Sequence, residues 1–169
     1  RNAANQAPPF VFSTEGLNLV ALTATDLAGN VGTATATFTL DKTAPTAVTD
    51  LHVGDVRVGE VDLLWTASTD AISGVAGYLV RVATFPITAG NFLSIPAAAA
   101  PAVQPGGTAI LQTVTGDTTR TLYFAVRSTD AAGNLSALSN PVFLDTDPPV
   151  ITALSPALGA TVSRPTRIS

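Results

Sequence analysis

The sequence predicts an all-β protein built as a tandem array of β-sandwich units, one complete and two partial. The segment at residues 25–30 (TDLAGN) recurs 104 residues later at 129–134 (TDAAGN), and the register holds without a gap as far as Pro149. Several runs alternate apolar and polar residues with a period of two, whereas no amphipathic stretch has the length of a helix. A repeat of this length is a domain rather than a short solenoid unit.

The first predicted element is a β-hairpin that ends a unit. Residues 18–25 and 33–40 alternate small or polar with apolar side chains, as half-buried strands do. Between them, Asp26 can accept hydrogen bonds from nearby backbone N–H groups, while Gly29 and Asn30 tolerate left-handed backbone conformations. A short, specific turn is therefore expected at this position.

The second copy predicts the same hairpin, with strands at residues 121–128 and 135–144. Its turn contains Asp130 and Asn134, which correspond to Asp26 and Asn30. We expect these four side chains to make turn hydrogen bonds and nothing more.

Three further strands are expected between the hairpins, at residues 61–65, 77–83 and 109–114. Residues 84–108 are rich in Pro and Gly, so a long helix is excluded there. We expect this segment to be an irregular connection that crosses from one sheet to the other.

Unit boundaries are predicted where an Asp is followed shortly by Pro, a stiff and short linker. These segments are residues 41–45 (DKTAP) and 145–149 (DTDPP). The expected organisation is a partial unit at residues 1–45, a complete sandwich of seven or so strands at 46–146, and the first strands of a third unit at 147–169.

Composition excludes several classes of protein. The net charge is −4 with only eight Lys and Arg residues, which gives no footprint for nucleic acid. No uninterrupted apolar stretch reaches the length of a membrane span, so membrane insertion is not expected. The absence of Cys excludes a disulfide framework. Because Met is also absent, we expect a processed chain or an excerpt of a longer one, with any signal peptide outside it.

The complete unit resembles bacterial fibronectin type III domains over about 100 residues. The segments that resemble strands B, C, F and G and the F–G turn are residues 61–65, 68–70, 74–78, 122–128, 130–136 and 139–140. One departure is Leu122, which stands where such domains often carry Tyr. Residues 10–45 and 150–169 resemble the end and the beginning of bacterial immunoglobulin-like repeats. The implied fold is a tandem of immunoglobulin-like and fibronectin type III β-sandwiches.

The resemblance implies a non-catalytic module in a bacterial protein that is secreted or on the cell surface. The first hypothesis is a structural spacer of a fibre, surface layer or adhesin, whose partners are neighbouring domains or copies. Such copies could assemble head to tail, with residues 150–169 of one chain completing residues 10–45 of the next by strand addition. The alternative hypothesis is an accessory region of a secreted polysaccharide-degrading enzyme. Whether surface glycans are bound is left open.

Neither catalytic nor cofactor-binding residues are expected. His52 is the single histidine and Cys is absent, so zinc sites and Ser-His or Cys-His catalysis lack components. Trp65 could be a platform for sugars, but its place in an alternating Val-x-Leu-x-Trp run predicts a core position. Phe85 and Phe92 are expected to pack beneath the irregular connection rather than to bind a ligand.

Calcium is the one cofactor that the sequence suggests. Ca²⁺ takes six to eight oxygen ligands from carboxylates, amides and carbonyls. Asp41, Asp145 and Asp147 lie in the two linkers, where they could meet carboxylates in the turns of a neighbouring unit. An ion there would stiffen the joint. The alternative is that these side chains only cap turns.

Overall fold

The computed structural model describes residues 12–146, in which β-strands are the dominant element and no α-helix is present. The elements are β1 (Gly16–Thr25), β2 (Val31–Leu40), β3 (His52–Arg57), β4 (Glu60–Thr66), β5 (Val75–Ala83), the short 3₁₀ helix η1 (Phe92–Ser94), β6 (Ala109–Thr115), β7 (Leu122–Asp130) and β8 (Val142–Leu144). The all-β prediction is confirmed. None of the described helices could span a bilayer.

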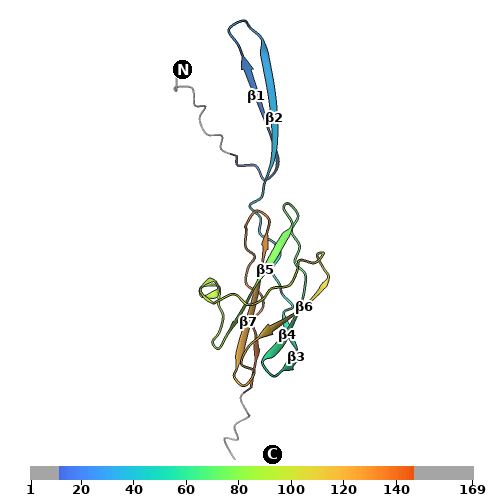
Figure 1. Cartoon of the computed structure of the whole chain (residues 1–169), viewed down its shortest axis with the longest axis vertical. Helices are drawn as coiled ribbons and strands as arrows, with labels where there is room; N and C mark the ends of the chain where they lie inside the picture. Colours follow the sequence, from blue (N-terminus) through green and yellow to red (C-terminus); the bar gives the residue numbers. More distant parts are fainter. Residues whose placement is uncertain (1–11, 147–169) are drawn as a thin grey trace, which may run out of the picture.

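The first predicted hairpin is present and stands away from the other strands (Figure 1). Strands β1 and β2 pair antiparallel along their whole length without a register shift. In the turn, Asp26 Oδ1 accepts the N–H groups of Ala28 and Asn30 at 2.9 Å. Gly29 has a φ of 89°, a left-handed conformation that only glycine adopts at low cost.

The remaining six strands form two three-stranded antiparallel sheets, in the orders β3-β4-β6 and β5-β7-β8. The connection at residues 84–108 runs from β5 to β6 and therefore passes from one sheet to the other, as expected. Strand β3 was not among the expected strands. Gly54 and Asp55 interrupt its alternation, and its pairing with β4 shifts register between Val53 and Val56.

The core lies between these two sheets and is centred on Trp65. Its side chain is 2 % exposed, so the prediction of a core position is confirmed. Trp65 from β4 meets Tyr78 from β5 edge to face, with ring centroids 5.5 Å apart. Other buried members include Val61, Leu63, Val80, Ile110, Phe124 and Val126. Alternate residues of facing strands thus supply the apolar contact that holds the sheets together.

The two phenylalanines of the irregular connection have different environments. Phe92 is fully buried, as expected, with the guanidinium groups of Arg81 and Arg127 at 5.0 and 5.2 Å from its ring centroid. Phe85 is 50 % exposed, so the prediction that it packs beneath the connection is wrong. Phe92, and not Phe85, is the phenylalanine of this connection that packs against Arg81 of β5 and Arg127 of β7.

The last expected strand, at residues 135–144, is much shorter than predicted, because β8 contains only three residues. Two serine side chains replace the missing strand as partners of β7. Ser136 Oγ accepts the N–H of Ser128 at 3.0 Å, and Ser139 Oγ accepts the N–H of Val126 at 3.1 Å. The N–H groups of both serines donate to the carbonyls of the same two β7 residues. Side-chain hydroxyls thereby satisfy buried backbone groups that a regular strand would have paired.

The expected beginning of a third unit at residues 147–169 lies outside the described residues. Residues 150–169, which would supply the added strands in the strand-addition hypothesis, therefore lie outside them too. Head-to-tail assembly and the unit boundaries therefore remain predictions.

Replacing Ser136 with Ala should destabilise the chain, because the buried Ser128 N–H would lose its acceptor. We expect a loss of roughly 1–3 kcal/mol in the free energy of unfolding. Ser94→Ala is the matched control, since Ser94 is exposed and its loss should cost under about 0.5 kcal/mol. Urea denaturation of the two variants measures the difference. Equal midpoints would contradict a structural role for the Ser136 hydroxyl.

Candidate functional site

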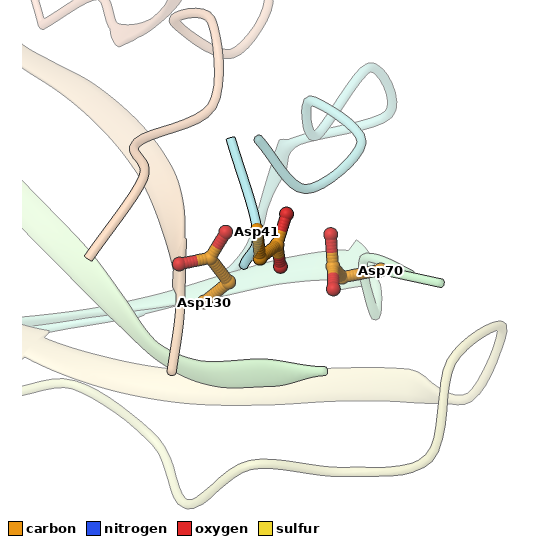
Figure 2. Close-up of side chains that lie close together, drawn as sticks. All are labelled: Asp41, Asp70 and Asp130. Atoms are coloured by element: carbon orange, nitrogen blue, oxygen red, sulfur yellow. The ribbon is translucent and has the colours of Figure 1, made fainter. Parts of the chain in front are cut away.

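The two sheets β3-β4-β6 and β5-β7-β8 together form what we call the two-sheet body. Three carboxylates meet at one end of this body, the end that faces the hairpin. Asp41 follows β2, Asp70 lies in the loop between β4 and β5, and Asp130 is the last residue of β7. Oxygen atoms of the three side chains all lie within 4.8 Å of one another. Figure 2 shows the three side chains arriving from separate segments of the chain, with Asp41 between the other two in this view.

Backbone N–H groups hold two of these carboxylates in place. Asp70 Oδ1 accepts the N–H groups of Ile72, Ser73 and Gly74 at 3.1, 3.0 and 2.8 Å, an arrangement that folds the loop around the carboxylate. Asp41 accepts the N–H of Thr43 at 2.9 Å and that of Ser73 at 3.1 Å. Ser73 N–H is therefore shared between two of the three carboxylates.

Asp130 is held by its own turn. Its Oδ1 accepts the backbone N–H of Asn134 at 2.8 Å, and its Oδ2 accepts the Asn134 side-chain N–H at 2.7 Å. The same Asn134 Nδ2 donates to the carbonyls of Asp41 and Thr43 at 3.2 and 3.4 Å. The turn hydrogen bonds predicted for Asp130 and Asn134 are confirmed. The prediction that these side chains do nothing more is wrong for Asn134, because its side chain also donates to two carbonyls of the linker.

The group concentrates negative charge away from solvent. Asp41 is 8 % exposed and Asp130 is 3 % exposed. Among residues 12–146 the ion pairs join Arg57 to Glu60 and to Asp62. Both pairs lie on the β3-β4-β6 sheet and do not involve the three carboxylates. Like charges at this separation repel, whereas the N–H groups that Asp41 accepts favour its charged form.

The surroundings of Asp41 favour its ionised form. The pKa of Asp41 lies below its ordinary 3.8, and the adjacent Ser73 side chain is the largest cause. Ser73 Oγ is buried beside the carboxylate but lies outside normal hydrogen-bond geometry. Partial burial of Asp41 acts in the opposite direction, and the N–H groups of Thr43 and Ser73 lower the pKa further. Asp41 is therefore charged at neutral pH.

This donor set suits a hard divalent cation. Carboxylate and carbonyl oxygens are the ligands that Ca²⁺ takes, and soft sulfur or imidazole ligands are absent from the group. Asp70 also borders an open hollow of about 270 Å³ that is lined by threonine and alanine side chains of the linker and the loop. Asp41, Asp70 and Asp130 could thus bind a cation that arrives from solvent.

Only one of the three residues suggested for calcium joins this group. Asp41 belongs to it, whereas Asp145 follows β8 at the opposite end of β7, because Leu144 pairs with Leu122. The eight residue-to-residue steps from Leu122 to Asp130 span about 26 Å of extended strand. Asp147 lies outside the described residues. The approach of Asp70 and Asp130 to Asp41 was not predicted, because it depends on how the strands that carry them pack.

The single histidine of the sequence lies on the surface. His52 begins β3, where its Nδ1 lies 2.8 Å from the carbonyl oxygen of Asp50. It is not part of the carboxylate group.

Comparisons with known proteins relate the chain to parts of bacterial enzymes. It is 36 % identical over 131 residues to chitinase A1 of Niallia circulans, a match of 73 % of this chain and 16 % of that protein. It is 37 % identical over 135 residues to exoglucanase A of Cellulomonas fimi, covering 70 % of this chain and 13 % of that protein. Endoglucanase B of Cellulomonas fimi is 36 % identical over 138 residues, covering 76 % and 12 %.

The chain therefore spans less than a fifth of the length of each of these relatives. No family model matches it.

The lowered pKa of Asp41 predicts how stability depends on pH. Because the folded state favours the carboxylate, its contribution is present above the unfolded pKa and is lost as pH falls through the lower folded pKa. In chelator, Asp41→Asn should thus be less stable than the parent at neutral pH, and the difference should shrink below about pH 4.

Denaturation between neutral pH and about pH 3 measures this difference. Asp55→Asn, at an exposed position on β3, is the control for the substitution itself and should change stability by less than about 0.5 kcal/mol. A gap between Asp41→Asn and the parent that is constant across this range would contradict the proposed role of the charge.

Proposed function

We propose that this chain is a non-catalytic, fibronectin type III-like accessory region of a secreted bacterial polysaccharide-degrading enzyme. One observation carries the proposal. Three relatives named for different activities, on chitin and on glucan, share similarity to this chain over a small fraction of their lengths. A segment common to enzymes of different specificity is more readily explained as an accessory part than as the catalytic part.

The architecture supports the same proposal. The complete unit that we propose, at residues 46–146, consists of two small sheets around an apolar core. Its polar side chains are used mainly to hold turns and edges, as Ser136, Ser139 and Asn134 do. Such a unit suits a spacer or support between functional domains.

The comparisons favour this accessory function over the first hypothesis, a module of a fibre, surface layer or adhesin. The named relatives are a chitinase and two glucanases, and none is named for adhesion or filament formation.

Deleting residues 46–146 from the full-length polypeptide tests the proposal. We expect hydrolysis of the insoluble polysaccharide to fall several-fold, because the region would position the catalytic domain at the surface. Hydrolysis of a soluble oligosaccharide should be unchanged. The isolated chain should release no reducing sugar from chitin or cellulose. Hydrolysis by the isolated chain, or equal loss on both substrates, would contradict a non-catalytic role.

We further propose that Asp41, Asp70 and Asp130 bind Ca²⁺ at the joint between the hairpin and the two-sheet body. The observation that favours it is the close approach of three carboxylates, two of them buried, without a cationic side chain in the group. A bound ion would neutralise their mutual repulsion and connect the linker to both the β4–β5 loop and the β7 turn. Its effect would be mechanical, limiting movement of the hairpin.

Calcium should therefore raise the melting temperature of the chain relative to chelator. Free Ca²⁺ at about 100 times its Kd would add roughly 2.7 kcal/mol of stability, because only the folded chain brings the ligands together. Asp70→Asn combined with Asp130→Asn should abolish the calcium-dependent shift. The control is Asp117→Asn, since Asp117 is bonded only within its own local turn, to Thr119 and Arg120. Identical melting curves of the parent in calcium and in chelator would exclude this site.

A further inference from the structure

An aromatic surface lies on the outer face of the β5-β7-β8 sheet, at the end opposite the carboxylate group. Tyr123 of β7 and Phe143 of β8 are direct partners in the strand register. Their ring centroids are 5.8 Å apart and their planes are inclined by 31°. Phe143 is 56 % exposed, and neither ring belongs to the core between the sheets.

The two rings border a hollow of about 230 Å³. The connection that follows β5 and the segment around the start of β8 supply the other walls, with Pro86, Ile87, Pro141 and Val142. All four of these residues are prolines or have β-branched side chains, so the hollow is largely preformed.

Among the described residues that line this hollow, none offers a carboxylate, guanidinium or ammonium group, and the one polar side-chain group is the Tyr123 hydroxyl. A charged ligand would lose hydration here without gaining an ionic partner. An uncharged ligand with an apolar face would suffer no such penalty. The surface is therefore complementary to a neutral molecule.

A neutral sugar ring has the required shape and chemistry. One face of a pyranose presents C–H groups, which pack on the electron-rich faces of aromatic rings, while its hydroxyls remain in water or bond to a phenol. Pockets that enclose whole small ligands are usually about 300–1,000 Å³. The smaller hollow would accommodate one sugar unit of a chain that continues along the surface.

We propose that Tyr123 and Phe143, with the hollow beside them, bind a neutral polysaccharide chain. The choice of polysaccharide rests on the proposed function, whereas the location and the neutrality of the site come from the side chains themselves. Trp65 and Phe92 are buried and cannot contribute. Phe85 is exposed next to Pro86 and extends the apolar surface.

Titrating the full chain with cellohexaose and, separately, with the hexamer of N-acetylglucosamine tests this proposal by NMR. Saturable shifts are expected for residues 86–87, 123 and 141–143 with at least one of the two probes. Tyr123→Ala and Phe143→Ala should each weaken binding about tenfold or more, since each removes one stacking surface. Leu111→Ala, which removes a 59 % exposed side chain from β6 on the other sheet, should bind like the parent.

Three results would overturn the site: no saturable shift with either hexamer, binding that survives both aromatic substitutions, or an equal loss in Leu111→Ala. Melting curves separate a further case. If Phe143→Ala lowers the melting temperature as a core substitution does, then Phe143 packs against another part of the polypeptide and the proposal fails.

The fate of the proposed function can be distinguished from that of the site. If deletion of residues 46–146 impairs hydrolysis of insoluble substrate while neither hexamer binds, the accessory function stands and only the glycan site is wrong. If a hexamer binds but the full-length polypeptide degrades no polysaccharide, the glycan site stands and the proposed accessory function is wrong.

Discussion

The contact between Trp65 and Tyr78 is the constraint on which most of the two-sheet body depends. The two rings come from different sheets, so their burial fixes the distance between those sheets. Tyr78 also accepts the backbone N–H of Ser68 through its hydroxyl at 2.8 Å. Ser68 lies just before Asp70, so the contact that closes the core also holds the loop that carries one of the three carboxylates.

The linker is held from both sides by polar contacts. On the hairpin side, Glu15 Oε1 accepts the N–H of Lys42 at 3.0 Å and the hydroxyl of Thr43 at 2.5 Å. On the other side, Asn134 donates to linker carbonyls. The repeated turns share two hydrogen bonds, from the backbone and the side-chain N–H of the Asn to the Asp carboxylate. Among the described residues, only the turn at Asp130 also meets a linker. The repeated motif therefore combines a local role with a role at the joint.

The two proposed sites use opposite ends of the same strand. Asp130 ends β7 beside the linker, and Tyr123 lies near its start beside the aromatic hollow. A cation at one end would affect the orientation of neighbouring parts, whereas a glycan at the other end would attach the body to a polymer.

The alternating runs predicted most strands and the core position of Trp65, since a half-buried strand must place apolar residues on one face. The Asp-x-x-Gly-Asn turn was equally predictable, because its hydrogen bonds and its glycine conformation are local. Strand β3 was missed because Gly54 and Asp55 interrupt its pattern. The shortening of β8 could not be foreseen, since Ser136 and Ser139 replace backbone acceptors only when β7 lies beside them.

The sequence by itself determined the all-β class, the internal repeat and the local hydrogen bonds of the repeated turn. Only the tertiary structure decided which carboxylates and which aromatic side chains meet. It brought Asp41 to Asp70 and Asp130, left Asp145 at the far end, buried Phe92 and exposed Phe85. The physical reason is that periodicity records which face of a strand is apolar, while the proximity of side chains depends on how strands distant in sequence pair and pack.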